Sequence, residues 1–375
     1  MTNEADNIDR TPRLGPLVDN ETIAEEIDGQ DLVIVLSRFN IGAIEKIADY
    51  RKGSRRAAKM IVVTSMGQYL LKRRACGRDG RAQVDVAHAV QRRLSEHRFP
   101  VAGLIETVDG ETLVEHNGRI YELFRFIRGN RFDKSNPAAA ESGRVLAHFH
   151  DILREFPNEL ESKNSFHLNM SFVSKIGDVA SRLTLHEPSD QLEGIESSVE
   201  YLQSQYENAF TKVESVDFSS LPTSIVHSDW HPGNMLYKDG EIIAVIDFDS
   251  LRVSPRVSDI ANGALQFSMR MGEVENVDSW PDSFRGHTIQ SLVQSYDQFT
   301  KLPLMASERS IIPFLMIEAL IVESVIPIIK NGSFGRVRGS SFIRMVERKL
   351  RWLEPRTQRV IDVIQPSMGD EDSFA

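Results

Sequence analysis

Cysteine is almost absent from this chain, which has 375 residues and a single cysteine, Cys76. One cysteine cannot form a disulfide within the chain, so a disulfide-stapled scaffold is excluded and a reducing compartment is favoured. Residues 1–13 are polar and contain no apolar run, so they do not predict a secretory signal. Together these features predict a cytoplasmic protein.

An excess of positive charge is also missing. Lysine and arginine number 44 against 54 aspartates and glutamates, which gives a formal net charge of −10. Such a chain gains little from the phosphate backbone of DNA or RNA, so we expect no nucleic-acid partner. Apolar residues make up 41% of the chain and charged residues 26%, and these proportions support a packed globular core.

One apolar run, residues 311–329, is nearly long enough to span a membrane. It contains Glu318, Glu323 and two prolines. An acidic side chain near the centre of a membrane span costs on the order of 3 kcal/mol. The run therefore predicts a buried core helix whose glutamates face polar groups, and we expect no membrane partner.

Composition and periodicity divide the chain into four parts: a polar tail at 1–16, a lobe at 17–127, a second lobe at 128–363 and an acidic tail at 364–375. A lobe rich in strands followed by a lobe rich in helices predicts an α+β, two-lobed architecture.

The first lobe shows the pattern of an antiparallel sheet with one helix. Strands are expected at 57–63 and 68–75, and helical spacing of apolar residues follows at 81–97. Asn117-Gly118 is a hairpin-turn signal, and it precedes a further strand at 119–127. Beyond this strand the apolar spacing is mostly helical.

The most informative stretch covers residues 227–234, which read HSDWHPGN, followed by an apolar strand that ends in DFD at 247–249. Phosphoryl transfer needs magnesium held against the nucleotide phosphates, and carboxylate and amide oxygens suit this ion. A further carboxylate must accept the proton of the attacking hydroxyl. Asp229, Asn234 and Asp247 supply both functions if the loop places them around one cavity.

Two other interpretations of this stretch stay open. His227, Asp229 and His231 alternate as the ligands of a zinc hydrolase would on a strand, although Pro232-Gly233 ends that strand at once. The stretch could also be an ordinary structural turn.

The same stretch resembles the catalytic loop of the aminoglycoside phosphotransferase and choline kinase-like family. The family's H-x-D-x-H-x-x-N pattern and its later metal-binding aspartate are matched by His227, Asp229, His231, Asn234 and Asp247. The DFD variant is similar to type II homoserine kinases. The resemblance implies a protein-kinase-like fold, with a small β-rich N-terminal lobe and a larger, mostly helical C-terminal lobe. It also implies transfer of the γ-phosphate of ATP, or of GTP, to a small-molecule hydroxyl with Mg²⁺.

The resemblance assigns a role to each residue of this stretch. Asp229 would be the catalytic base, and Asn234 and Asp247 would hold magnesium. His227 would pack and hydrogen-bond the loop, and His231 would hold it near the metal.

Two aspartates outside the eight-residue pattern would support it. Asp249 completes the DFD variant, and Asp259, in the segment SDIA, would brace the catalytic loop.

The first lobe would hold the nucleotide. Lys72 stands where kinases keep the lysine that contacts the phosphates. Residues 124–127, called the hinge below, would bind the adenine through backbone groups of Arg125 and Ile127. Gly53 and Ser54 are expected to form a turn whose backbone N–H groups would cover the phosphates, although an ordinary hairpin turn would look the same.

Strand alternation places Lys72 on one face and Arg73 on the other. In the family the following helix supplies a carboxylate that pairs with this lysine. Asp85 and Glu96 are the candidates on that helix, and neither matches the family pattern closely.

Substrate selection is expected from the second lobe. Trp230 flanks the base, and Glu318 and Glu323 lie on an apolar helix, where a buried carboxylate needs a partner such as an amine of the substrate. Five residues are about 1.4 helical turns, so at most one of the two glutamates faces a narrow pocket. Glu323 is the preferred one.

The acceptor itself cannot be read from the chain. Amino alcohols, homoserine-like compounds, sugars and aminoglycosides all fit the pattern. An alternative is a catalytically silent kinase-like module that binds nucleotide without turnover.

Overall fold

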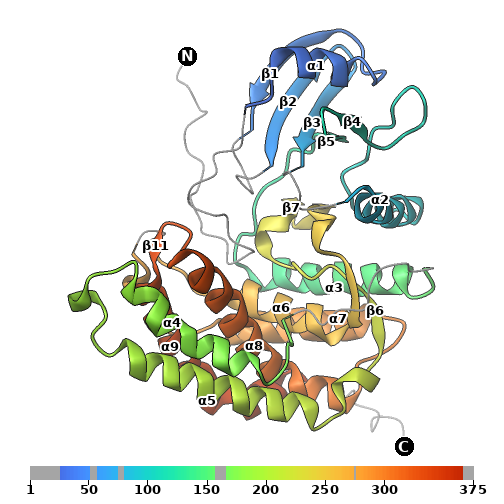
Figure 1. Ribbon diagram of the computed structural model, residues 1–375. Helices are drawn as coiled ribbons and strands as arrows, with labels where there is room; N and C mark the ends of the chain where they lie inside the picture. Colours follow the sequence, from blue (N-terminus) through green and yellow to red (C-terminus); the bar gives the residue numbers. More distant parts are fainter. Residues whose placement is uncertain (1–25, 51–56, 75–79, 157–165, 274–275, 366–375) are drawn as a thin grey trace, which may run out of the picture.

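The computed structural model describes residues 26–50, 57–74, 80–156, 166–273 and 276–365. Figure 1 shows a small sheet-containing lobe above a larger helical lobe, so the predicted α+β, two-lobed architecture is confirmed. The predicted tail at 1–16 and most of the tail at 364–375 lie outside the described residues.

The small lobe is built on one antiparallel sheet. Its five strands have the order β1-β2-β3-β5-β4 and are β1 (Ile44–Asp49), β2 (Ala58–Thr64), β3 (Gly67–Arg73), β5 (Arg119–Arg125) and β4 (Val114–His116). The β4–β5 turn is formed by Asn117 and Gly118, with φ of 49° and 68°, as the hairpin signal predicts. The predicted helix is present as α2 (Arg81–Glu96).

The prediction of a single helix in this lobe is wrong, because α1 (Gly29–Leu36) precedes the sheet. Asp28 caps it by accepting a hydrogen bond from the backbone N–H of Gln30. Leu32, Val35 and Leu36 pack against one face of the sheet. Eight residues hold about two turns, so the periodic signal is too short to read from the sequence.

The large lobe is mainly helical. Its α-helices are α3 (Asn136–Leu153), α4 (Phe172–Thr184), α5 (Ile195–Glu214), α6 (Val257–Ser268), α7 (Gly286–Phe299), α8 (Ala306–Asn331), α9 (Gly339–Leu353) and α10 (Thr357–Val363). Its strands are β6 (Thr223–Val226), β7 (Met235–Lys238), β8 (Glu241–Val245), β9 (Arg252–Pro255), β10 (Ser333–Phe334) and β11 (Val337–Arg338). Short 3₁₀ turns are η1 (Ser189–Gln191), η2 (Phe218–Ser220), η3 (Pro232–Asn234), η4 (Phe248–Ser250), η5 (Val277–Ser279) and η6 (Glu354–Arg356).

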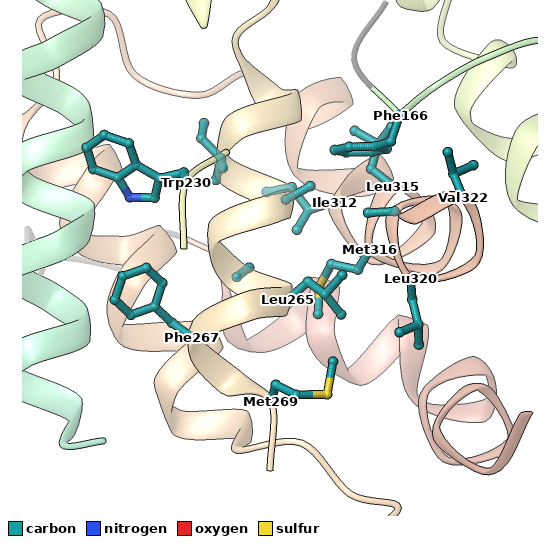
Figure 2. Packing of buried hydrophobic residues seen from close by; sticks show 14 of the residues in the cluster. Phe166, Trp230, Leu265, Phe267, Met269, Ile312, Leu315, Met316, Leu320 and Val322 are labelled. Carbon is teal, nitrogen blue, oxygen red and sulfur yellow. The ribbon is translucent and has the colours of Figure 1, made fainter. Parts of the chain in front are cut away.

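The long apolar run forms α8, which lies inside the large lobe. By length and composition α8 could cross a membrane, but 78% of its most apolar 18-residue window is buried within the protein. Figure 2 shows Ile312, Leu315 and Met316 of α8 packed beside Leu265 of α6. The helix therefore has the buried position that its glutamates and prolines predict.

Candidate active site

The segment 227–234, called the catalytic loop below, is hydrogen-bonded to Asp259 in the first turn of α6. The Asp259 carboxylate accepts the backbone N–H of His227 at 2.6 Å and that of Ser228 at 2.8 Å. Ser228 has φ 61°, a strained conformation that these two bonds stabilise. The structure therefore contains the brace that the family resemblance implies.

Asp229 and Asn234 face each other across this loop. The Nδ2 of Asn234 donates to the backbone oxygen of Asp229 at 3.0 Å and to its Oδ2 at 2.9 Å. Burial alone would raise the pKa of Asp229, but nearby His231 and other loop groups more than offset this, so the pKa is lowered. Asp229 is thus an ionised carboxylate that can accept a hydrogen bond from an acceptor hydroxyl.

The β7–β8 hairpin brings Asp247 to the same end of the loop. Met235 pairs with Val245, and the backbone N–H of Ile246 donates to the Asn234 oxygen at 3.0 Å. Asp247 follows at φ 69°, and its side chain is 35% exposed. Asn234 and Asp247, which are thirteen positions apart in sequence, therefore lie at the same end of a short hairpin.

This set of oxygen atoms fits magnesium. Asn234 uses its amide nitrogen on Asp229, so its Oδ1 is the atom that remains for a cation. The partly exposed Asp247 carboxylate supplies a second, charged oxygen ligand. Hard oxygen donors of this kind are those that Mg²⁺ prefers, usually together with water and substrate phosphate.

Lys72 reaches this site from β3 in the small lobe. Its Nζ lies 2.6 Å from Asp249 Oδ2 and 3.9 Å from Asp247 Oδ1. Burial would lower the pKa of Lys72, but the surrounding carboxylates, chiefly that of Asp249, more than offset this and raise it. Lys72 is therefore a charged amine beside Asp247, and by strand alternation Arg73 projects from the opposite face.

The expectation that α2 pairs a carboxylate with Lys72 is wrong. Asp85 lies 3.4 Å from Arg81 on the helix surface, and Glu96 is exposed at the last turn of α2. The partner of Lys72 is instead Asp249, which is 177 residues further along the chain.

The two loop histidines differ in their contacts. His231 Nδ1 accepts the backbone N–H of Gly233 at 2.9 Å, and its Nε2 lies 3.4 Å from Asp229 Oδ2. His227 packs its ring 5.2 Å from that of Phe248, as expected. The expected hydrogen bond from its side chain is wrong, because neither ring nitrogen has a partner among the described residues. Burial lowers the pKa of His227, so the ring is neutral and serves for packing.

The hinge continues from the end of β5, and its backbone groups alternate between facing β3 and facing away from it. The Phe126 N–H donates to the Gln68 oxygen of β3 at 3.0 Å, so by alternation Arg125 and Ile127 face away from β3. The Arg125 N–H already donates to the Gly103 oxygen at 2.8 Å. Adenine binding here stays a prediction, and it falls to the Arg125 oxygen and the Ile127 N–H.

The predicted phosphate-covering turn at Gly53 and Ser54 lies outside the described residues.

The structure corrects the substrate role predicted for Trp230, and it pairs Glu318 structurally, as expected for one of the two glutamates. Trp230 is completely buried, and its Nε1 donates to Ser142 Oγ of α3 at 2.9 Å, so it belongs to the core (Figure 2). Glu318 is also completely buried, and its Oε2 lies 2.8 Å from His167 Nδ1. His167 in turn contacts Glu214, so Glu318 is part of a structural cluster.

Glu323 remains the substrate candidate. Its carboxylate accepts from Asn262 Nδ2 at 3.0 Å and from Gln266 Nε2 at 2.8 Å, both on α6. Burial, followed by the negative charge of Asp229, raises the pKa of Glu323 to about 8. Asn262 Oδ1 is buried and has no partner among the described residues. The oxygens of Glu323 and Asn262 thus have no cationic partner in the described part of the chain.

Three functional neighbours were missed by the sequence reasoning. Arg74, Glu122 and His88 form a buried group with Asp249 beside Lys72. The usable signal was Glu122, a lone carboxylate in the otherwise apolar strand sequence YELF. A buried strand carries such a residue only with a cationic partner.

The zinc-hydrolase interpretation is not supported by the arrangement of ligands. His227 is enclosed by aromatic rings. Within the described ranges, no group of three or more histidine, cysteine, aspartate or glutamate side chains could hold a metal ion by itself.

The model of the phosphotransferase enzyme family matches residues 48–299, about two thirds of the chain. Two curated relatives are "Stress response kinase A" of Salmonella choleraesuis and "Serine/threonine protein kinase RdoA" of Salmonella typhimurium. Each is 26% identical over 179 residues, which are 48% of this chain and 50% of the relative. The chain thus spans about half the length of the curated relatives it matches.

Solved structures show the fold over nearly the whole chain. An aminoglycoside phosphotransferase from Alicyclobacillus acidocaldarius superposes with a TM-score of 0.64 at 16% identity, covering 90% of this chain and 97% of that one. An amicoumacin kinase in complex with AMP-PNP and Ca²⁺ gives a TM-score of 0.62 at 14% identity, covering 91% and 96%. The predicted kinase-like fold is confirmed.

Proposed function

Since this chain belongs to the phosphotransferase enzyme family, we propose that it is a small-molecule kinase, which transfers the γ-phosphate of ATP to a hydroxyl group with Asp229 as base. The observation that carries this assignment is the meeting of four groups from both lobes. Asp229 and Asn234 are in hydrogen-bond contact, Asp247 lies at the same hairpin end, and Lys72 of β3 lies 3.9 Å from Asp247.

The proposed step is a direct displacement. The acceptor hydroxyl oxygen bonds to the γ-phosphorus while the bond to the β–γ bridging oxygen breaks, ADP leaves, and the hydroxyl proton passes to the Asp229 carboxylate. Lys72 holds the phosphates in place. Magnesium bound through Asn234 and Asp247 would neutralise the negative charge of the nucleotide. We propose ATP as the donor, with GTP as the alternative that a nucleotide screen decides.

For the acceptor we propose a small molecule that carries both a hydroxyl and an amine. Glu323 lies within electrostatic reach of Asp229, and a bound ammonium would lower its raised pKa and favour the ionised carboxylate, so an amine at Glu323 and a hydroxyl at Asp229 could belong to one small compound. Amino alcohols, homoserine-like compounds and aminoglycosides meet this requirement, whereas a neutral sugar does not. A homoserine-like acceptor, suggested by the DFD variant, is one proposal within this class.

A second candidate acceptor is the hydroxyl of a serine or threonine in a protein, because one curated relative is named a serine/threonine protein kinase. We further propose that the protein works in the cytoplasm without nucleic acid or membrane.

The test is an ADP-release assay with Mg²⁺, ATP or GTP, and separate sets of amino alcohols, hydroxy amino acids, aminoglycosides, neutral sugars and serine-containing peptides. Amine-containing acceptors should stimulate ADP release in wild type and not in Asp229→Asn. Stimulation by neutral sugars alone would refute the role of Glu323. Tight binding of nucleotide with no release in any set would favour the silent module.

A further inference from the structure

A continuous row of charged groups leads from Lys72 through Asp249 and Arg74 to Glu122. The carboxylate of Asp249 accepts from Lys72 Nζ at 2.6 Å through Oδ2 and from Arg74 Nη2 at 2.8 Å through Oδ1. Lys72 and Arg74 are two residues apart and project from the same side of the chain. One carboxylate therefore bridges two cations from the small lobe.

Arg74 is itself held by Glu122 of β5. The guanidinium donates through Nε to Glu122 Oε2 at 2.7 Å and through Nη2 to Oε1 at 3.0 Å. The side chains are 4% and 0% exposed. Two parallel hydrogen bonds to a buried carboxylate fix the plane of the guanidinium, so Arg74 presents its remaining contact to Asp249 in one direction.

Helix α2 joins this row through a histidine where the family would supply a carboxylate. His88 Nε2 lies 2.7 Å from Glu122 Oε1, and Nδ1 lies 2.8 Å from Thr112 Oγ1. The ionised carboxylate only accepts hydrogen bonds, so Nε2–H is the donor. The position of α2 is thereby coupled to Glu122.

We propose that Glu122 and Arg74 are positioning residues for Lys72, acting through Asp249 in place of a helix carboxylate. This inference rests on the proposed role of Lys72 in holding the nucleotide phosphates. A lysine ammonium on a four-carbon stem has many positions, and Asp249 can restrain it only if Asp249 is itself held. The bidentate Glu122–Arg74 pair supplies that hold from inside the sheet.

The test compares the binding of a phosphate-bearing ligand with that of a phosphate-free one. Dissociation constants for AMP-PNP with Mg²⁺ and for adenosine are measured for Glu122→Gln, Arg74→Met and Lys72→Met. Loss of a charge-assisted hydrogen bond predicts AMP-PNP binding weaker by about tenfold to a hundredfold. Adenosine binding should stay within about twofold, because adenosine carries no phosphate for Lys72 to hold. A structural defect would weaken both ligands alike.

Arg73→Met is the matched control, since it removes a buried cation from the neighbouring position on the opposite face of β3. It should leave the ratio of the two constants unchanged. Combining Arg74→Met with Lys72→Met should weaken AMP-PNP binding no more than Lys72→Met alone, because Arg74 acts through Lys72. Glu122→Gln keeps the shape of its side chain and serves if Arg74→Met does not fold.

Three results would overturn the inference: equal loss of both ligands, unchanged AMP-PNP binding in Glu122→Gln and Arg74→Met, or independent losses that multiply in the double variant. If Lys72→Met itself binds AMP-PNP as wild type does, the nucleotide site of the proposed function fails as well. The inference alone fails when Lys72→Met weakens binding and the other two variants do not.

Discussion

Replacing Glu323 by glutamine should make the stability of the protein less dependent on pH. The Glu323 carboxylate accepts hydrogen bonds from two amides of α6, and burial together with the charge of Asp229 raises its pKa to about 8. An acid with a raised pKa keeps its proton in the folded state at a pH where the unfolded chain releases it. The free energy of unfolding therefore falls as the pH rises from about 4.5 to about 8.

The expected size follows from this shift. Each pH unit in that window changes the free energy of unfolding by at most about 1.4 kcal/mol per group. Because Glu323 is partly exposed, we expect a loss of about 1–2 kcal/mol between pH 6 and pH 8, which glutamine avoids. The substitution should be tolerated, because the amide of Asn262 can turn its unpartnered Oδ1 toward the new NH₂ group.

Thermal unfolding of wild type and Glu323→Gln at pH 6, 7 and 8 measures this directly. The Tm of the variant minus that of wild type should grow by a few degrees over the range. Glu207→Gln, which removes one charge from the exposed surface of α5, is the control and should show no growth. A difference that stays constant with pH would refute the reasoning, because Glu323 would then be ionised throughout.

The remaining predictions concern the catalytic groups. Asp229→Asn should keep nucleotide binding and lower turnover by about 10²–10⁴-fold, and near wild-type turnover on a true acceptor would exclude Asp229 as the base. Asp247→Ala should abolish magnesium-dependent nucleotide binding and Asn234→Ala should weaken it less, which calorimetry with and without Mg²⁺ can measure. Lys72→Ala should raise the Kd of the nucleotide or lower kcat far more than Arg73→Ala does, and the opposite order would mean that the strand alternation is reversed.

Local sequence determined the catalytic loop and several elements around it. Asp229 and Asn234 are only five positions apart, and the hairpin that returns Asp247 is short, so their meeting depends on contacts within about twenty residues. The family resemblance singled out Lys72, and alternation along the strand separated it from Arg73, which was enough to place it beside Asp247. In each of these cases the decisive interaction is local, and a motif or a period reports it.

Tertiary structure alone decided which partner each buried charged group meets. Periodicity indicates that a side chain is buried, but it does not show what lies opposite, because that depends on how distant elements pack. Lys72 therefore found Asp249 rather than Asp85 or Glu96, and Glu318 found His167, 151 residues away. Trp230 shows the same limit: it adjoins the base in sequence, yet its backbone turns the indole into the core. Because burying an unpaired charge is costly, each buried charged group must have a partner. Which residue that partner is depends on how distant elements pack, within a lobe or between the two lobes.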